Sequence, residues 1–115
     1  MILLLLIACG GGIGAVLRYC VIRLVTKYHR PSLIATVIVN SIGSFFSGWA
    51  VHHTLDEPIF SAIFITGVLG GFTTFSSFAF DAFRLLDAKR YNICLYYCLC
   101  MIIFSFIAVV LGYTL

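Results

Sequence analysis

The chain has its most unusual composition at Gly67-Val68-Leu69-Gly70-Gly71-Phe72-Thr73-Thr74-Phe75-Ser76-Ser77-Phe78, a stretch inside a long apolar segment that holds three glycines, two threonines and two serines. A regular membrane-spanning helix has little reason to gather helix-weakening residues at its centre. Non-helical backbone at membrane depth is tolerated only where it is buried in protein or lines a polar cavity. The stretch therefore predicts a helix broken mid-membrane, with freed carbonyls available to cations and freed amides to anions. Phe75 and Phe78 would leave one face of the resumed helix beside this candidate ion site.

The composition places the whole chain in a bilayer. Hydrophobic residues make up 63% of its 115 residues and charged residues only 10%, and a soluble protein of this size could not bury so much apolar surface. The length predicts one domain, residues 1–115. The basic residues form no stripe, which argues against nucleic-acid binding. The five cysteines lack the spacing of a metal site, so we interpret them as small packing residues.

Four segments have the roughly 20 apolar residues that a helix needs to cross the hydrocarbon core. They are residues 2–26, 32–54, 59–86 and 91–114. The connections are short, so successive helices must run antiparallel. The sequence thus predicts an all-α membrane protein with four transmembrane helices, the third of them broken mid-membrane. The first segment lacks the basic start and the cleavage site of a signal peptide, so we expect it to be retained as a helix.

Charged side chains are distributed unevenly between the two ends of the predicted helices. The first connection contains Lys27 and Arg30, the third contains Lys89 and Arg90 with Arg84 nearby, and the second contains the acidic Asp56 and Glu57. Lys and Arg are enriched in cytoplasmic loops. We therefore expect the first and third connections in the cytoplasm and both termini outside, in a plasma membrane.

The glycines of the first predicted helix allow two interpretations. Gly10, Gly12 and Ala15 match a dinucleotide-binding pattern, but that pattern needs a βαβ unit, and a second membrane span follows instead. We interpret Gly10 and Gly14 as a GxxxG contact that lets two helix backbones approach closely. Arg18 in the same span must face water, an anion or a partner. It lies either in an aqueous vestibule or, by snorkelling, at the membrane interface.

Small and polar residues share one face of the second predicted helix. They are Asn40, Gly43, Ser44 and Ser47. Glycine and serine on such a face commonly serve helix packing, which is our interpretation for three of the four. Asn40 differs, because a buried amide needs several partners and offers two donors to an anion.

The last two predicted helices contain few polar side chains. Asp81 and Arg84 are three residues apart, and we expect a structural pair on one helix face rather than a proton-coupling carboxylate. Tyr96, Tyr97 and Ser105 lie among aliphatic residues of the fourth helix. A tyrosine there is typical of the membrane interface, whereas Ser105, near mid-span, is the better candidate for a pore hydroxyl.

Three motifs occur together, in order, over essentially the whole chain. They are GGGIGAVLRY (10–19), NSIGSFFSG (40–48) and GGFTTFSSF (70–78). In this combination they resemble the Fluc/CrcB family of fluoride channels. The resemblance implies a channel rather than an enzyme, which exports fluoride passively and selectively and so lowers cytoplasmic fluoride. It also implies an antiparallel dual-topology dimer with a structural Na⁺ at the dimer interface and pores between the protomers.

The resemblance further implies roles for individual residues. These are Na⁺ binding by the backbone carbonyls of Gly70 and Thr73, a vestibule position for Arg18, and fluoride-pore positions for Asn40, Phe75, Phe78, Tyr97 and Ser105. The residue types suit a small, tightly hydrated anion. Aromatic edges carry partial positive charge, amides and hydroxyls donate directional hydrogen bonds, and conduction needs sites weak enough for the ion to leave.

The chain departs from the family pattern in two respects. Ala79 and Val109 stand where some members carry pore hydroxyls, so one polar track is expected to be incomplete. The one-sided loop charge also differs from the near balance that a dual-topology homodimer needs. We therefore expect the dimer partner to be an oppositely oriented paralogue rather than a second copy of this chain. This chain would then be one half of a heterodimeric fluoride channel, either a conducting or a non-conducting half.

A small multidrug antiporter is the alternative from another class, since it too is a dimer of short four-helix chains. Such an antiporter needs a membrane-embedded carboxylate in its first helix for proton coupling. The first predicted helix has no Asp or Glu. The fluoride channel is therefore the preferred hypothesis.

Overall fold

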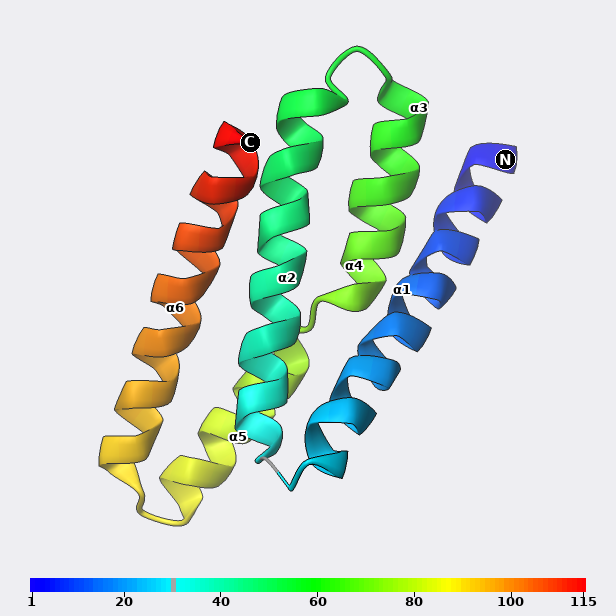
Figure 1. The fold of residues 1–115 in the computed structure, drawn as a ribbon. Coiled ribbons are helices and arrows are strands. Elements are labelled where there is room, and N and C mark those ends of the chain that lie inside the picture. The colour runs from blue at the N-terminus through cyan, green and yellow to red at the C-terminus, as the bar shows by residue number, and fades with distance from the viewer. Residues whose placement is uncertain (30) are drawn as a thin grey trace.

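The computed structural model describes residues 1–29 and 31–115; Arg30, which we counted in the first basic connection, lies outside the described residues. The helices are α1 (Ile2–Lys27), α2 (Ser32–His53), α3 (Pro58–Ser61), η1 (Ala62–Leu69), α4 (Gly70–Phe72), α5 (Phe75–Asp87) and α6 (Tyr91–Thr114). Four helical stretches of the described chain are long and apolar enough to cross a membrane. They match the predicted segments to within a few residues, which confirms the all-α, four-span architecture (Figure 1).

The third span is interrupted near its middle, as predicted. Its first half runs without a gap through α3, η1 and α4, and η1 has the wide turns of a π-helix. Thr73 and Thr74 are then extended, with φ/ψ of −78°/156° and −148°/114°. The helix resumes at Phe75 as α5. The span is therefore two helices joined by an extended link.

The glycines of this stretch do not make the break, contrary to the expectation that they weaken the helix there. Gly67, Gly70 and Gly71 all lie in helical segments, and no described glycine has a positive φ. The break falls on Thr73 and Thr74 instead. Because the glycines are helical and lack side chains, their effect is on the distance to the neighbouring helix.

That neighbour is α1, which crosses the first half of the third span at close range. A Cβ atom on Gly71 would collide with the Gly11 carbonyl, and a Cβ atom on Gly14 would collide with the Val68 carbonyl and lie 2.8 Å from the Phe72 nitrogen. Gly14 is buried. The structure thus confirms the close backbone approach predicted from the GxxxG spacing in α1, and its partner is the glycine-rich stretch itself.

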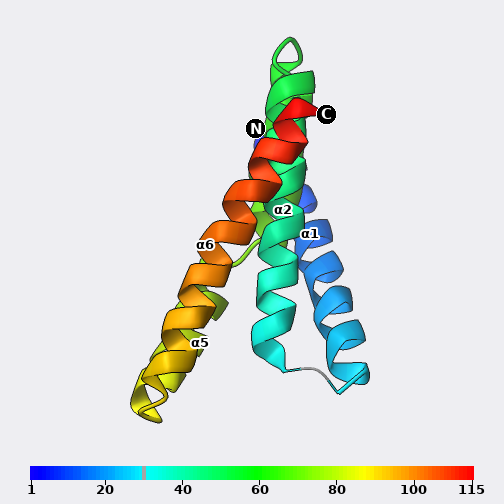
Figure 2. The same cartoon turned by 60° about the vertical axis from the view of Figure 1, so that its left-hand side comes forward.

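The break lets the third span change partners halfway across. η1 and α4 pack against α1, whereas α5 packs against α6. In Figure 1 the upper half of the span lies between α1 and α2, and α5 passes behind α2 to reach α6. Figure 2 shows α5 and α6 diverging together from α1 and α2 toward the α5–α6 connection. An unbroken helix could not make both contacts.

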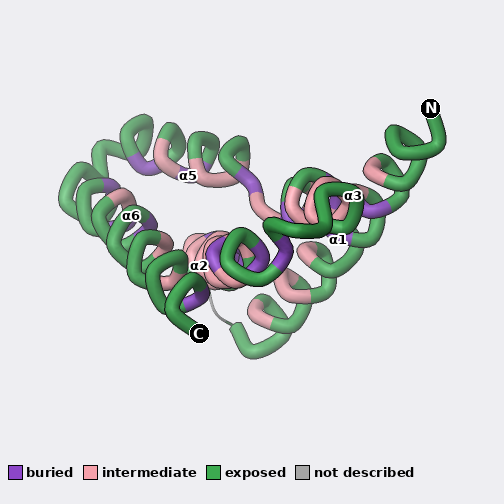
Figure 3. The backbone as a smooth tube through the Cα atoms, turned by 90° about the horizontal axis from the view of Figure 1, so that it is seen from above, coloured by how far each residue is buried: buried purple, intermediate pink, exposed green. Residues whose placement is uncertain are grey.

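The buried side chains follow the seams between helices, and most other residues are exposed (Figure 3). One cluster joins Leu85 of α5 to Cys94, Tyr97 and Met101 of α6, and Leu33 of α2 packs against it. This cluster fixes the later part of α5 against α6, and Phe78, near the start of α5, packs against it. It therefore holds the start of α5, and the side chains that project from it, at a defined position.

Candidate functional site at the helix break

A cavity of about 660 Å³ lies beside the break, between α2, the start of α5 and α6. Its walls unite most of the side chains predicted for an ion path with the extended link of the third span. They include Asn40, Phe75, Phe78 and Ser105, together with Thr73 and Thr74. Residues far apart in the sequence converge here because the break directs α5 toward α6.

Asn40 binds the break through both ends of its side-chain amide. Its Oδ1 accepts a hydrogen bond from the Thr74 backbone nitrogen at 2.9 Å, and its Nδ2 donates to the Thr74 carbonyl at 3.0 Å. The same Nδ2 lies 3.4 Å from the Met101 sulfur. The amide thus replaces the helical acceptor of the Thr74 N–H and adds a donor to the Thr74 carbonyl. Asn40 holds the extended conformation of Thr74 in place.

The side chain of Thr74 caps the helix that follows. Its Oγ1 accepts a hydrogen bond from the Ser77 backbone nitrogen at 3.1 Å, which satisfies one of the free N–H groups at the start of α5. The capping oxygen also lies 3.2 Å from the Ser76 hydroxyl. Thr74 therefore starts α5 at Phe75 and so sets the direction in which the aromatic rings project.

These two arrangements free the carbonyls predicted for cation binding. In a continuous helix the Thr74 nitrogen would donate to the Gly70 carbonyl, and the Ser77 nitrogen would donate to the Thr73 carbonyl. Here the first donates to Asn40 and the second to the Thr74 side chain. Gly70 is exposed and Thr73 is half-buried. Both carbonyls thus lack their helical donors.

The two aromatic rings predicted for the ion path share one face of α5. Their centroids are 5.8 Å apart, as the i, i+3 spacing predicted. Phe78 is half-buried and packs at 5.4 Å against the ring of Tyr97. Phe75 is 77% exposed, an unusual state for a ring that lines a cavity. Its exposure leaves the cavity open on the side where Phe75 stands.

Tyr97 lies outside this cavity, among the buried side chains between α5 and α6. Its hydroxyl donates a hydrogen bond to Asp81 Oδ2 at 3.2 Å, and the Thr36 hydroxyl of α2 donates to the same oxygen at 3.2 Å. Asp81 is therefore a buried link between three helices. The expected Asp81–Arg84 pair is not formed, because the Arg84 guanidinium lies over the Phe80 ring, 5.7 Å from its centroid.

Arg18 is half-buried on α1 and does not line the cavity at the break. Its vestibule role stays a prediction. Of the two positions at which we noted a missing hydroxyl, Val109 lines the cavity and Ala79 is exposed one residue beyond Phe78.

Several wall residues were not assigned to the ion path by the sequence. Ser44 and Ser47, interpreted as packing residues, line the cavity. The capping role of Thr74 could have been predicted from the sequence, because a threonine three residues before Ser77 has the spacing of a helix N-cap. The place of Met101 in the cavity wall could not be predicted, because an apolar side chain in an apolar helix does not indicate a contact with Asn40.

Four membrane-crossing helices, with one broken beside a polar-lined cavity, define a multi-pass membrane protein of the kind that binds or passes small ions. Comparison with known sequences is consistent with this class. The chain belongs to the family described as CrcB-like protein, Camphor Resistance (CrcB), whose model matches residues 5–113.

Several relatives carry the name fluoride-specific ion channel FluC. The chain is 42% identical to the FluC of Azobacteroides pseudotrichonymphae, with 96% of this chain and 92% of the relative covered. It is 38% identical to FluC 1 of Staphylococcus haemolyticus over the full length of both chains, 100% of each. It is 37% identical to FluC 3 of the archaeon Methanosarcina barkeri, with 99% of this chain and 89% of the relative covered.

Proposed function

We propose that this chain forms a fluoride-selective ion channel, which exports fluoride passively across the plasma membrane and thereby lowers its cytoplasmic concentration. The observation that carries the proposal is the convergence of Asn40, Phe75, Phe78 and Ser105 on one cavity at the break of the third span. Relatives that align over nearly the whole chain are named for this activity. An ion channel is not an enzyme, and the proposal includes no catalytic step.

The chemistry of the cavity suits an anion that must be dehydrated but not trapped. Its polar groups are neutral hydroxyls and an amide, with no Lys or Arg among the residues that line it. A full positive charge would bind fluoride too firmly for rapid release. Fluoride can make weaker contacts, one after another, with the positive edges of Phe75 and Phe78 and with the hydroxyls of Ser44, Ser47 and Ser105. Transient replacement of water by such contacts supports selective passage.

We propose that the channel is an antiparallel dimer and that the pores lie between the protomers. A polar cavity that opens to lipid is unfavourable, because groups at membrane depth need partners there. Phe75, Ser76 and Gly70 are exposed next to the break, so this face requires a protein neighbour. A partner on this face would cover the freed backbone and close the cavity.

The carbonyls of Gly70 and Thr73 are proposed to hold a structural Na⁺ at the dimer interface. The two hydrogen bonds that divert the donors of these carbonyls, Thr74 to Asn40 and Ser77 to Thr74, support this assignment. Unwound backbone carbonyls are typical Na⁺ ligands in membrane proteins with broken helices. When bound, the cation would join the two broken helices and make the local field more favourable to anions.

The proposed orientation puts the α1–α2 and α5–α6 connections in the cytoplasm and both termini outside. The α5–α6 connection contains Lys89 and Arg90, whereas the α2–α3 connection contains Asp56 and Glu57. Such a bias favours one orientation. It supports a second candidate function: this chain is one half of a heterodimeric fluoride channel and pairs with a paralogue inserted the opposite way.

Ion efflux from liposomes tests these proposals. Purified protein is reconstituted in liposomes loaded with potassium fluoride or potassium chloride, and efflux after addition of valinomycin is followed with ion-selective electrodes. Fluoride efflux without chloride efflux is expected. If the chain is silent alone but conducts fluoride when co-expressed with an oppositely oriented paralogue, it is the half-channel. Proton-linked efflux of organic cations without fluoride efflux would overturn the proposal in favour of an antiporter.

A further inference from the structure

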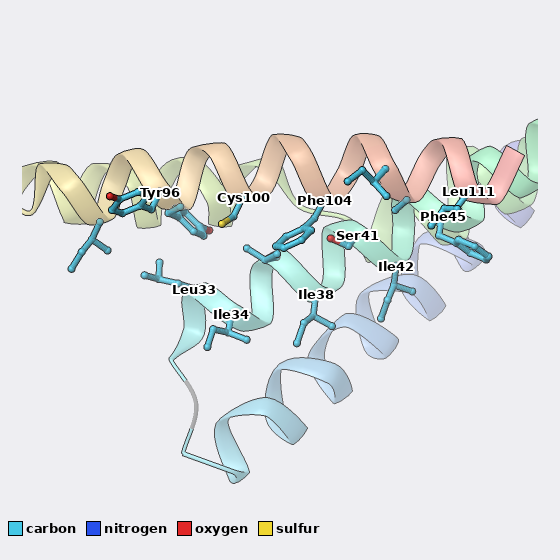
Figure 4. A pocket seen from close by; sticks show the side chains of 15 residues that line it. Leu33, Ile34, Ile38, Ser41, Ile42, Phe45, Tyr96, Cys100, Phe104 and Leu111 are labelled. Carbon is cyan, nitrogen blue, oxygen red and sulfur yellow. The ribbon is translucent and has the colours of Figure 1, made fainter. Parts of the chain in front are cut away.

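An apolar groove runs along the seam between α2 and α6, on the side away from the cavity at the break. It has a volume of about 700 Å³, and its walls include Leu33, Ile38, Ile42, Phe104, Ile107 and Leu111. Figure 4 shows Cys100 and Phe104 reaching from α6 toward α2, with Ser41 between the two helices. The groove and the cavity share no wall residue, so they are separate sites on the two sides of one seam.

The groove exists because α2 and α6 touch closely at one end and separate toward the other. Near the C-terminus of α6, a Cβ atom on Gly112 would collide with the Phe45 carbonyl of α2. Such close contact is possible only for glycine. Toward the α5–α6 connection the helices diverge (Figure 2), and the side chains of Leu33 and Ile93 face the widening space.

The position and length of the groove fit a lipid acyl chain. From Leu33 to Phe45 it follows α2 for about 18 Å, and from Ile93 to Leu111 it follows α6 for about 27 Å. Half of the ~30 Å hydrocarbon core is about 15 Å, so the groove is at least as long as one leaflet is deep. The exposure of the groove to lipid rests on the proposed dimer, because a partner that covers the cavity on the opposite side of the seam leaves the groove side to lipid.

A hollow lined by charged side chains adjoins the wide end of the groove. It has a volume of about 300 Å³, shares Leu33 with the groove, and contains Ser32, Arg84 and Arg90. Two carboxylates, Asp81 and Asp87, also line it. Hydrogen bonds from Thr36 and Tyr97 hold the Asp81 carboxylate but leave its negative charge in place, so the two guanidinium groups share the hollow with two carboxylates. Guanidinium groups bind phosphate through paired, charge-assisted hydrogen bonds.

We propose that the groove and the charged hollow together bind one glycerophospholipid from the leaflet at the α5–α6 connection. One acyl chain lies in the groove, and the phosphate contacts Arg84 and Arg90. The juxtaposition carries the assignment: an apolar groove at least one leaflet long lies next to a hollow that contains two guanidinium groups, and the two share Leu33 as a wall. The bound lipid would fill the wedge between α2 and α6 and so support the seam whose other side forms the proposed ion path.

Photo-cross-linking tests this site on the full chain. The protein is reconstituted with phosphatidylglycerol that carries a diazirine in one acyl chain, irradiated and digested, and the labelled residues are mapped by mass spectrometry. Label concentrated on groove residues such as Ile38, Ile42 and Phe104 is expected. Label spread evenly over all lipid-facing helices would overturn the proposal.

Two variants separate the acyl site from the phosphate site. Ser41→Phe fills the groove and removes a hydroxyl that has no hydrogen-bond partner among the described residues, so it should fold and should lower groove labelling at least fivefold. Ile103→Phe, at an exposed position outside the groove, is the matched control and should label normally. Equal labelling of both variants would refute the acyl site.

The phosphate contact is tested with Arg84→Gln/Arg90→Gln. This double variant should lose labelling by the diazirine phosphatidylglycerol and keep labelling by the matching diacylglycerol, which has no phosphate. Equal labelling by both lipids in the wild-type protein and in the double variant would exclude the proposed role of the two arginines.

Discussion

Asn40 uses both ends of its amide on the backbone of one residue, Thr74, and this pairing defines the break at the scale of single residues. The break needs such a partner, because an extended peptide between two helices leaves a donor and an acceptor without helical bonds. The nearby Thr74 hydroxyl caps α5 in turn. Asn40 thus acts on the ion path through Thr74 and α5, in addition to lining the cavity.

Asn40→Leu should open this arrangement with little change in side-chain volume. It would leave the Thr74 N–H without its partner, and such a buried group costs roughly 1–3 kcal/mol. We expect hydrogen–deuterium exchange at Thr74 and Phe75 to speed up by at least about tenfold, the factor that corresponds to ~1.4 kcal/mol, and fluoride efflux to fall.

Ser44→Ala is the matched control, since Ser44 lines the same cavity and makes no side-chain hydrogen bond to the described break. Its exchange rates at Thr74 should stay at the wild-type level. Unchanged exchange in Asn40→Leu would show that another contact holds the break.

At the scale of elements, two close crossings organise the bundle: α1 on η1 and α4, and α2 on α6. The sequence predicted the four spans well, because hydropathy and span length are local properties. It placed the break in the right stretch, although the extended residues are Thr73 and Thr74 and the glycines are helical. Whether Gly71 bends a helix or admits a neighbour depends on α1, which lies about 60 residues away in the chain.

The partners of Asp81 show the same limit of prediction. The nearest charged residue along the helix, Arg84, was the reasonable local partner. The actual partners, Thr36 and Tyr97, are 45 and 16 residues away. Long-range hydrogen bonds of this kind follow from the path of α5 after the break, and no spacing in the sequence encodes that path.

Gly14→Val tests the crossing of α1 over the third span. The added side chain would meet the Val68 carbonyl and the Phe72 nitrogen, and overpacking of this kind typically costs about 1–3 kcal/mol. We expect the free energy of unfolding, measured by steric trapping in bicelles, to fall by that amount. Gly12→Val is the control, because a Cβ atom on Gly12 meets nothing within 4 Å; equal destabilisation by both variants would contradict the proposed packing.

At the scale of the whole molecule, the distribution of charge determines how the protein can assemble. A chain that inserts both ways can form an antiparallel dimer with itself, whereas a chain that inserts one way needs a partner of opposite orientation. The end of α1, which carries Lys27, and the α5–α6 connection, which carries Lys89 and Arg90, lie at one end of the bundle (Figure 1). The α2–α3 connection, which carries Asp56 and Glu57, lies at the other end. We therefore predict a single orientation in the membrane.

Reporter fusions at the C-terminus measure this orientation. Alkaline phosphatase, active only outside the cytoplasm, should be active, and green fluorescent protein fused at the same point should stay dark. Lys89→Glu/Arg90→Glu should shift part of the population to the opposite orientation, because it removes both basic residues of the α5–α6 connection. Comparable activity of both reporters on the wild-type chain would instead indicate dual topology and a homodimer.

The central claim is that fluoride crosses beside the break, along Phe75 and Phe78. The most direct test compares fluoride efflux from liposomes containing Phe75→Ile, Phe78→Ile or the control Phe80→Ile, each with the partner that supports conduction in the wild-type protein. Phe80 is exposed on α5 outside the cavity. We predict that Phe75→Ile and Phe78→Ile cut efflux at least tenfold while the dimer stays assembled, and that Phe80→Ile conducts normally. Wild-type efflux from both Phe75→Ile and Phe78→Ile would contradict the account.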